Sequence, residues 1–181
     1  DDKKPYAYFL DPMMAEIEEF SKRMDIKRPE IVIEPGRSIV GEAGITLYTI
    51  GTIKDIEGIR KYVSVDGGMT DNIRPALYQA KYECVIANKA SQPSTDLVTI
   101  SGKCCESGDI LIRDAYIPLA ERGDILAIFS TGAYGYAMAS NYHKNPFPAT
   151  VLVKEGKSEV IVKRQTYEHM IENEVIPKSL V

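Results

Sequence analysis

A cysteine and a glutamate stand side by side at Cys105-Glu106, in a loop of small residues that runs from Gly102 to Asp109. A thiol can act as a general acid or as a nucleophile, and a neighbouring carboxylate offers an acceptor for an ammonium group of a substrate. No nearby feature of the sequence identifies a partner base for the thiol. The residues alone therefore also allow Cys105 to be an inert, buried cysteine.

Arg74 and Tyr78 are spaced to bind an anion together. They are four residues apart, so that one helical turn would place both side chains on the same face. The preceding pair Gly67-Gly68 permits a close approach of the backbone or a positive φ. Pro75 argues against a regular helix that begins before it. A carboxylate-binding pair is one interpretation, and a loop with a surface arginine is the other.

The turn Glu34-Pro35-Gly36-Arg37 could hold a phosphate or a carboxylate. Gly36 exposes backbone N–H groups, and the guanidinium of Arg37 suits a bidentate anion. The alternative is an ordinary Pro-Gly turn in which Arg37 pairs with Glu34.

The stretch from Ser130 to Tyr142 is rich in small residues and carries Tyr134. Small residues allow close packing around a ligand, to which a tyrosine hydroxyl can donate a hydrogen bond. A tightly packed core or subunit interface would show the same composition. We assign neither His143 nor His169 to a metal or to catalysis, because each is isolated in the sequence.

The composition is that of a globular protein and excludes several classes of partner. The chain has 181 residues, 44% of them apolar, and a net charge of −4. We therefore expect no nucleic-acid partner and, without an apolar run of about 20 residues, no membrane span. The three cysteines lack both zinc-ligand and C-x-x-C spacing, so we expect no metal site. Reduced thiols at Cys84 and Cys104 predict a cytoplasmic protein.

Residues 1–38 have the pattern of one α/β unit. Apolar residues recur at helical spacing over 11–25, where Asp11 can cap the helix and Pro12 suits its first position. The apolar run at 31–33 predicts a short strand. The turn at 34–37 then follows the C-terminal end of a strand, where an α/β barrel places its functional groups.

From residue 39 onward the pattern predicts a β domain, 39–181, made of short strands separated by turn residues. Such spacing is typical of an antiparallel barrel or sandwich. Glu155-Gly156-Lys157 predicts a hairpin loop, and Thr166 can cap a closing helix that ends at 174. The predicted strands are 45–54, 61–66, 81–87, 96–101, 109–113, 124–130, 149–154 and 158–164.

Four motifs stand in one order along the chain, and together they resemble the C-terminal part of the diaminopimelate decarboxylase family, from about Pro29 to Ala149. Two departures are minor: Cys104 replaces the usual aliphatic residue, and His143 stands where asparagine is commoner. The motifs are E-P-G-R-S at 34–38, V-D-G-G-M-x-D-N-I-R-P-A-L-Y at 65–78, G-x-x-C-E-S-G-D at 102–109 and G-A-Y-G-Y-x-M-A-S-N-Y at 132–142.

The resemblance implies a mainly β chain: a C-terminal β-barrel or sandwich domain preceded by the last helix and strand of a (β/α)8 barrel that binds pyridoxal 5'-phosphate. It also implies a homodimer with shared active sites, in which Cys105 is the proton donor in the partner subunit's site. The implied cofactor-binding residues are Glu34, Pro35, Gly36, Arg37 and Tyr134, and the implied substrate-binding residues are Arg37, Arg74, Tyr78, Glu106 and Tyr134.

The reaction implied by the resemblance is the decarboxylation of meso-diaminopimelate to L-lysine. The lysine that holds the cofactor would lie in a barrel that precedes Asp1, so we expect this chain alone to be inactive. One alternative is a related decarboxylase of another basic amino acid, for which Arg37 and Arg74 would lack a carboxylate to bind. Another is an isolated β domain that serves as a dimerisation module.

Overall fold

The computed structural model describes residues 4–180, which divide into two compact units between Pro35 and Gly36. The predicted domain boundary lies three residues later, after residue 38. Assignment of the first segment to a barrel stays a prediction.

The first unit contains helix α1, Tyr6–Arg23. The helix was predicted, but the predicted start is wrong: Pro5 is the N-cap, Asp11 does not cap the helix, and Pro12 lies inside it. Pro12 removes one N–H from the helical ladder, and the first turns continue on both sides of it. The helix ends two residues earlier than expected, because Asp25 adopts a left-handed conformation at φ 51°.

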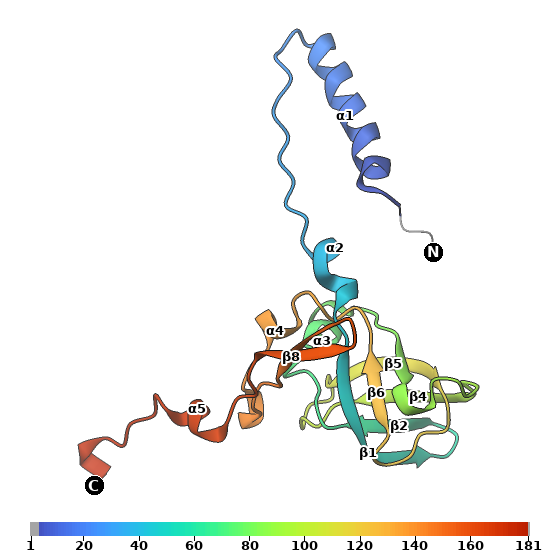
Figure 1. The fold of residues 1–181 in the computed structure, drawn as a ribbon, viewed down its shortest axis with the longest axis vertical. Coiled ribbons are helices and arrows are strands. Elements are labelled where there is room, and N and C mark those ends of the chain that lie inside the picture. The colour runs from blue at the N-terminus through green and yellow to red at the C-terminus, as the bar shows by residue number, and fades with distance from the viewer. Residues whose placement is uncertain (1–3, 181) are drawn as a thin grey trace. The chain divides into compact units, whose positions relative to one another are not determined.

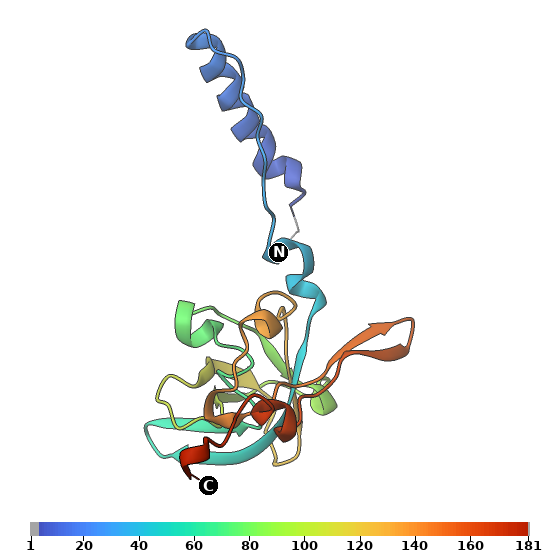
Figure 2. The ribbon, with the colours of Figure 1, turned by 90° about the vertical axis from the view of Figure 1, so that its left-hand side faces the viewer.

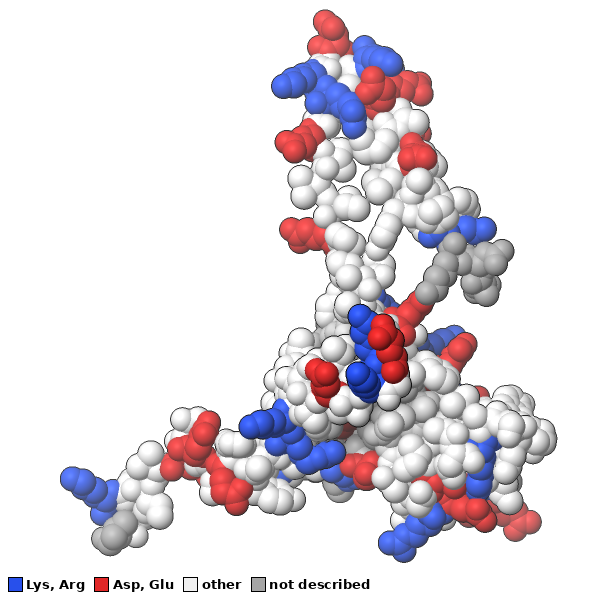
Figure 3. All heavy atoms as spheres, viewed as in Figure 1, with Lys and Arg blue, Asp and Glu red and all other residues white. Residues whose placement is uncertain are grey.

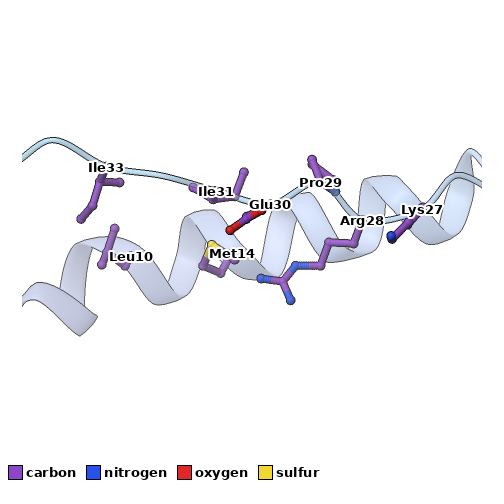
Figure 4. Close-up of a pocket in the computed structure, with 8 residues that line it drawn as sticks. All are labelled: Leu10, Met14, Lys27, Arg28, Pro29, Glu30, Ile31 and Ile33. Atoms are coloured by element: carbon purple, nitrogen blue, oxygen red, sulfur yellow. The ribbon is translucent and has the colours of Figure 1, made fainter.

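The segment after α1 returns along the helix without forming a strand (Figure 4). A strand was expected at 31–33, but a strand requires a hydrogen-bonded neighbour, and no described strand pairs with these residues. Ile31 and Ile33 instead face Leu10 and Met14 of the helix and line a pocket of about 510 Å³ with them. No residue of the predicted site lines this pocket.

A six-stranded sheet forms the second unit (Figure 1). Its order is β3-β6-β1-β2-β4-β5, and contacts between the edge strands β3 and β5 make it a nearly closed barrel. The predicted strands are confirmed, although β2 and β4 pair in parallel rather than antiparallel. The strands are β1 Thr46–Ile56, β2 Arg60–Val65, β3 Cys84–Ile86, β4 Asp96–Ser101, β5 Ile110–Ile117 and β6 Ile125–Ile128.

The core of the barrel consists of aliphatic side chains that point inward from these strands. Burial of each such side chain stabilises the fold by about 1.5–3 kcal/mol. β-branched residues predominate because they pack well on a pleated surface. The fully buried aliphatic residues are Ile50, Val63, Ile86, Val98, Ile100, Ile117, Leu126 and Ile128.

The remaining strands, β7 Thr150–Lys154 and β8 Lys157–Val162, form a hairpin that projects from the sheet (Figure 2). Positive φ at Glu155 and Gly156 fits the two-residue turn that such a hairpin favours. The predicted closing helix is α5, Tyr167–Ile171, which ends earlier than expected. Thr166 caps it as predicted, and His169 completes the capping box.

Short helices connect the strands, and three of the predicted site residues lie in them: Arg37 in α2, and Arg74 and Tyr78 in α3. No described helix is long and apolar enough to cross a membrane. Lys, Arg, Asp and Glu are interspersed on the face of the second unit seen in Figure 3. The short helices are α2 Arg37–Val40, η1 Gly41–Ala43, α3 Arg74–Tyr78, η2 Ala87–Lys89, α4 Gly135–Met138, η3 Tyr142–Lys144 and η4 Lys178–Leu180.

Candidate functional site

Two glycines bring the segment after Gly36 against the loop that carries Tyr134. Gly132 donates its N–H to the Gly41 carbonyl at 2.9 Å. A Cβ atom on Gly44 would lie 2.2 Å from the Gly132 Cα, and one on Gly132 would lie 2.0 Å from the Val40 carbonyl oxygen. Only glycine fits this approach, because the opposing atoms belong to the backbone.

Tyr134 adopts a left-handed conformation, φ 64°, immediately before α4. Its hydroxyl lies directly over Gly36, where a Cβ atom would be 2.1 Å from the tyrosine oxygen. The structure therefore joins two of the predicted site segments, which are almost 100 residues apart in the sequence. The backbone at Gly36 and the tyrosine hydroxyl together present polar groups at one place.

Arg74 lies between two aromatic rings. Its guanidinium carbon is 5.3 Å from the ring centre of Tyr78 and 5.0 Å from that of Tyr134. The arginine Nε is buried and has no hydrogen-bond partner among the described residues. Helix α3, with Pro75 in its first turn, holds Arg74 and Tyr78 on one face as the spacing predicted. A fixed cation with a spare donor is suited to an anionic ligand.

Arg37 lies over the ring of Tyr82, with its guanidinium carbon 5.5 Å from the ring centre. Tyr82 is buried, and its hydroxyl has no partner among the described residues. Tyr82 lies outside the four motifs, so no sequence pattern pointed to it. We call Gly36, Arg37, Arg74, Tyr78 and Tyr134 the arginine group.

The loop that carries Cys105 is fixed by a buried carboxylate. Asp109 is 2% exposed and accepts hydrogen bonds from the N–H groups of Met69 at 2.7 Å and Cys104 at 2.8 Å. The carboxylate would collide with a Cβ atom on Gly68 or on Gly102. Asp109 thus holds the Cys105 loop against the double-glycine loop that leads to α3.

A second buried polar pair supports the double-glycine loop. The hydroxyl of Tyr48 donates a hydrogen bond to Asp71, which also accepts one from the Gly68 N–H at 3.0 Å. Burial raises the pKa of the Asp71 carboxyl and, together with the Asp71 charge, raises the pKa of the Tyr48 hydroxyl well above its ordinary value. The loop before Arg74 is therefore tied to strand β1.

Cys105 itself is exposed, whereas Cys84 and Cys104 are partly buried. Burial raises the pKa of the Cys84 thiol to about 11. Burial and the nearby Asp109 charge raise the pKa of the Cys104 thiol to about 11 as well. Both of these thiols therefore stay protonated at neutral pH, and neither is a thiolate nucleophile there.

Glu106 accepts a hydrogen bond from the hydroxyl of Tyr142, and the His143 Nε2 lies 3.9 Å from the same carboxylate oxygen. The hydrogen bond to Glu106 raises the pKa of the Tyr142 hydroxyl. Tyr142 ends the last motif, but its contact with Glu106 could not be read from the sequence. We call Cys105, Glu106 and Tyr142 the thiol group.

The predicted residues of the second unit thus gather into two groups. The arginine group can bind an anion, and the thiol group combines a proton donor with an acceptor for a cation. No described hydrogen bond, ion pair or ring contact joins Cys105 or Glu106 to the arginine group. Glu34 and Pro35 belong to the first unit, so their place in the site stays a prediction. Residues 4–180 contain no cluster of three His, Cys, Asp or Glu side chains that could hold a metal ion.

Known proteins with similar sequences and structures share this β domain. The chain is 53% identical over 163 residues to the diaminopimelate decarboxylase of Bacillus subtilis, which covers 90% of this chain and 37% of that relative. A crystal structure of diaminopimelate decarboxylase from M. jannaschii in co-complex with L-lysine matches with a TM-score of 0.79 and 36% identity, over 91% of this chain and 38% of that one. The chain therefore spans less than half the length of these relatives.

A more distant match shows that decarboxylases with other names share this fold. A lysine/ornithine decarboxylase from Vibrio vulnificus, complexed with cadaverine, matches with a TM-score of 0.61 over 80% of this chain and 37% of that one. Its identity is 19%, so this likeness concerns the fold alone. The family model described as "Pyridoxal-dependent decarboxylase, C-terminal sheet domain" matches residues 7–132, and the chain therefore belongs to the pyridoxal-dependent decarboxylases.

Proposed function

We propose that this chain forms the C-terminal part of a diaminopimelate decarboxylase, a carboxy-lyase that converts meso-2,6-diaminopimelate to L-lysine and CO2. The observation that carries the proposal is the position of Arg74, held between Tyr78 and Tyr134 with a buried Nε that has no partner among the described residues. An orphaned donor on a fixed cation is stabilised by an anionic ligand. The names of the relatives support a dicarboxylate as that ligand.

The residues of the arginine group fit pyridoxal 5'-phosphate. Tyr134 presents a partly exposed ring and a hydroxyl beside the open backbone of Gly36, as a phosphate-bearing aromatic ring requires. Tyr134 and the backbone of Gly36 and Arg37 would hold the cofactor. The chemistry that the cofactor supplies when bound is withdrawal of the electron pair that loss of CO2 leaves on the substrate carbon.

Substrate choice follows from charge. Diaminopimelate carries a carboxylate and an ammonium at the end remote from the reaction, whereas ornithine and lysine carry only the ammonium there. In our proposal Arg37, Arg74 and Tyr78 bind the distal carboxylate, and Glu106 receives the distal ammonium. A substrate without the carboxylate would leave two arginines unpaired, and such sites discriminate strongly.

The thiol of Cys105 would donate the proton that replaces CO2 on the substrate carbon. The S–H bond breaks, a C–H bond forms with the electron pair left by the CO2, and water returns a proton to the thiolate. Cys105 is exposed on a loop held by Asp109, so it is free to meet a substrate at a defined place.

We further propose a cytoplasmic homodimer with shared sites. The arginine group has no proton donor such as a thiol, and no described hydrogen bond, ion pair or ring contact joins Cys105 or Glu106 to it. The thiol group would therefore complete the arginine group of the partner subunit. Three free cysteines support a reducing compartment.

A chimera tests the proposed function. In it, this chain replaces the matching C-terminal part of the Bacillus subtilis relative, which supplies the barrel. We expect L-lysine formation from meso-diaminopimelate and at least 100-fold lower kcat/KM with L-ornithine or L-lysine as substrate. Equal or better turnover of L-ornithine would show that the chain belongs to a different decarboxylase.

Mixed dimers of the same chimera test the shared site. One variant carries Cys105→Ala and the other lacks the barrel lysine that holds the cofactor. Each homodimer should be nearly inactive. Random 1:1 exchange should restore about a quarter of the parent activity, because half of the dimers then contain one intact site of two. No recovery, with subunit exchange verified by mass, would place Cys105 in its own chain's site.

A further inference from the structure

We infer that Tyr142 is a positioning residue, which orients the Glu106 carboxylate toward the distal ammonium of the substrate. The inference rests on the proposed function and adds a determinant of specificity to it. It begins from the contact of the Tyr142 hydroxyl with Oε1 of Glu106.

Both neighbours of the Glu106 carboxylate lie closest to the same oxygen, Oε1. The Tyr142 hydroxyl donates to Oε1, and the His143 Nε2 is also nearest to Oε1, at 3.9 Å. Among residues 4–180, Oε2 has no hydrogen-bond or ion-pair partner, and the Glu106 side chain is 41% exposed. A carboxylate can accept several hydrogen bonds at each oxygen. One oxygen is thus anchored, and the other is left for a ligand.

The turn that carries Tyr142 is itself held on several sides. Asn141 Nδ2 donates to the Asn145 carbonyl at 2.8 Å and to Gln165 Oε1 at 2.6 Å. Asn145 Nδ2 returns a hydrogen bond to the Tyr142 carbonyl at 3.0 Å. Just before this turn, Ser140 donates its N–H to the Thr70 carbonyl at 2.9 Å. A phenol on such a turn loses little further entropy when it orients its partner.

A neutral donor suits this task better than a cation. Lysine or arginine at position 142 would neutralise Glu106 and compete with the substrate's ammonium group. The Tyr142 hydroxyl is protonated at neutral pH, and its hydrogen bond to Glu106 raises its pKa further. Tyrosine can therefore orient the Glu106 carboxylate without neutralising it, so that the negative charge remains available to pair with the ammonium group of the substrate.

The test compares Tyr142→Phe with Tyr136→Phe in the chimera. Tyr136 lies in the same motif, is 58% exposed, and contacts Phe147 only through its ring, which phenylalanine preserves. We expect Tyr142→Phe to raise KM for meso-diaminopimelate about tenfold, and Tyr136→Phe to leave it unchanged. Inhibition by pimelate, a dicarboxylate without ammonium groups, should be the same in both variants and the parent. A general structural defect would weaken both ligands.

Two further measurements test whether Tyr142 affects substrate binding through the Glu106 carboxylate. Adding Tyr142→Phe to Glu106→Gln should raise KM no further, because the tyrosine acts through the carboxylate. In the unmodified 181-residue chain, tyrosine-selective NMR should show that Glu106→Gln lowers the pKa of Tyr142. An active chimera in which Tyr142→Phe leaves KM unchanged overturns the inference, as does an unchanged pKa of Tyr142. If the chimera does not act on diaminopimelate but Glu106→Gln lowers the pKa of Tyr142 in the 181-residue chain, the proposed function is overturned and with it the substrate role of Tyr142.

Discussion

The arginine group and the thiol group use opposite means to place their side chains. Close backbone approaches at Gly44 and Gly132 lock the arginine group, so that any added atom meets backbone. Cys105 and Glu106 of the thiol group stand on a loop that the buried carboxylate of Asp109 holds from one side. A rigid frame suits binding of a fixed anion, whereas an exposed loop suits a group that must reach a site on another surface.

The largest expected effect falls on the thiol group, in catalysis. In the chimera, Cys105→Ala should lower kcat for diaminopimelate by about 10²–10⁴, because a general acid contributes that much to the rate. Cys104→Val should leave kcat within about twofold, because Cys104 is partly buried and its pKa of about 11 suits a structural thiol. Steady-state assays of lysine formation measure both. A Cys105→Ala enzyme at full rate would remove the thiol from the mechanism.

The next effect falls on the arginine group, in stability. Gly132→Ala should destabilise the chain by about 2–4 kcal/mol, because its Cβ would lie 2.0 Å from the Val40 carbonyl oxygen. Gly108→Ala, in the Cys105 loop, should change stability by less than about 0.5 kcal/mol, because a Cβ there meets no atom within 4 Å. Urea unfolding followed by circular dichroism compares the two. Equal losses of stability in the two variants would show that the backbone around Gly132 is no more tightly packed than the Cys105 loop.

A third prediction asks whether the arginine group binds the dicarboxylate. Arg74→Ala in the chimera should lower kcat/KM for diaminopimelate about 100-fold, because a charge-assisted hydrogen bond to the distal carboxylate is lost. The loss should appear in both KM and kcat. Inhibition by pimelate should weaken in parallel, in contrast to the Tyr142→Phe variant. Turnover equal to that of the parent would leave Arg74 a structural residue stacked between two tyrosines.

The sequence was sufficient for features that depend on local pattern. The strands of the barrel, the Glu155-Gly156 turn and the Thr166 cap all follow from alternation, turn residues and capping chemistry. The spacing of Arg74 and Tyr78 also predicted their shared helical face. These features are local because each needs only neighbouring residues to form.

Features that depend on contacts distant in sequence could not be predicted in the same way. The strand expected at 31–33 requires a neighbouring strand that the described chain does not provide. The hydrogen bonds that Asp109 accepts from Met69, and Glu106 from Tyr142, join residues 40 and 36 positions apart. Nothing in the local pattern marks those partners. The pattern predicts Pro12 in the first turn of the helix, whereas the helix begins at Tyr6 and Pro12 lies inside it.

The smallest effect concerns a thiol that belongs to neither group. Cys84, in β3, packs against the barrel core, and burial raises its pKa from 9.0 to about 11. Because the folded state holds the proton more tightly than the unfolded state, this contribution to stability is complete below about pH 9. It is lost as the pH rises from about 9 to 11, and the full loss is about 2–3 kcal/mol at most. Cys84→Val should abolish this part of the alkaline loss.

The measurement is the free energy of unfolding in urea at pH 8 and at pH 10.5, for the parent chain and for Cys84→Val. Comparing the change with pH within each chain cancels the packing difference between a thiol and two methyl groups. The parent should lose more stability than the variant over this interval, by about 1–2 kcal/mol. Equal losses would mean that the Cys84 thiol ionises with the same pKa in the folded and the unfolded chain, so that burial in β3 does not hold its proton.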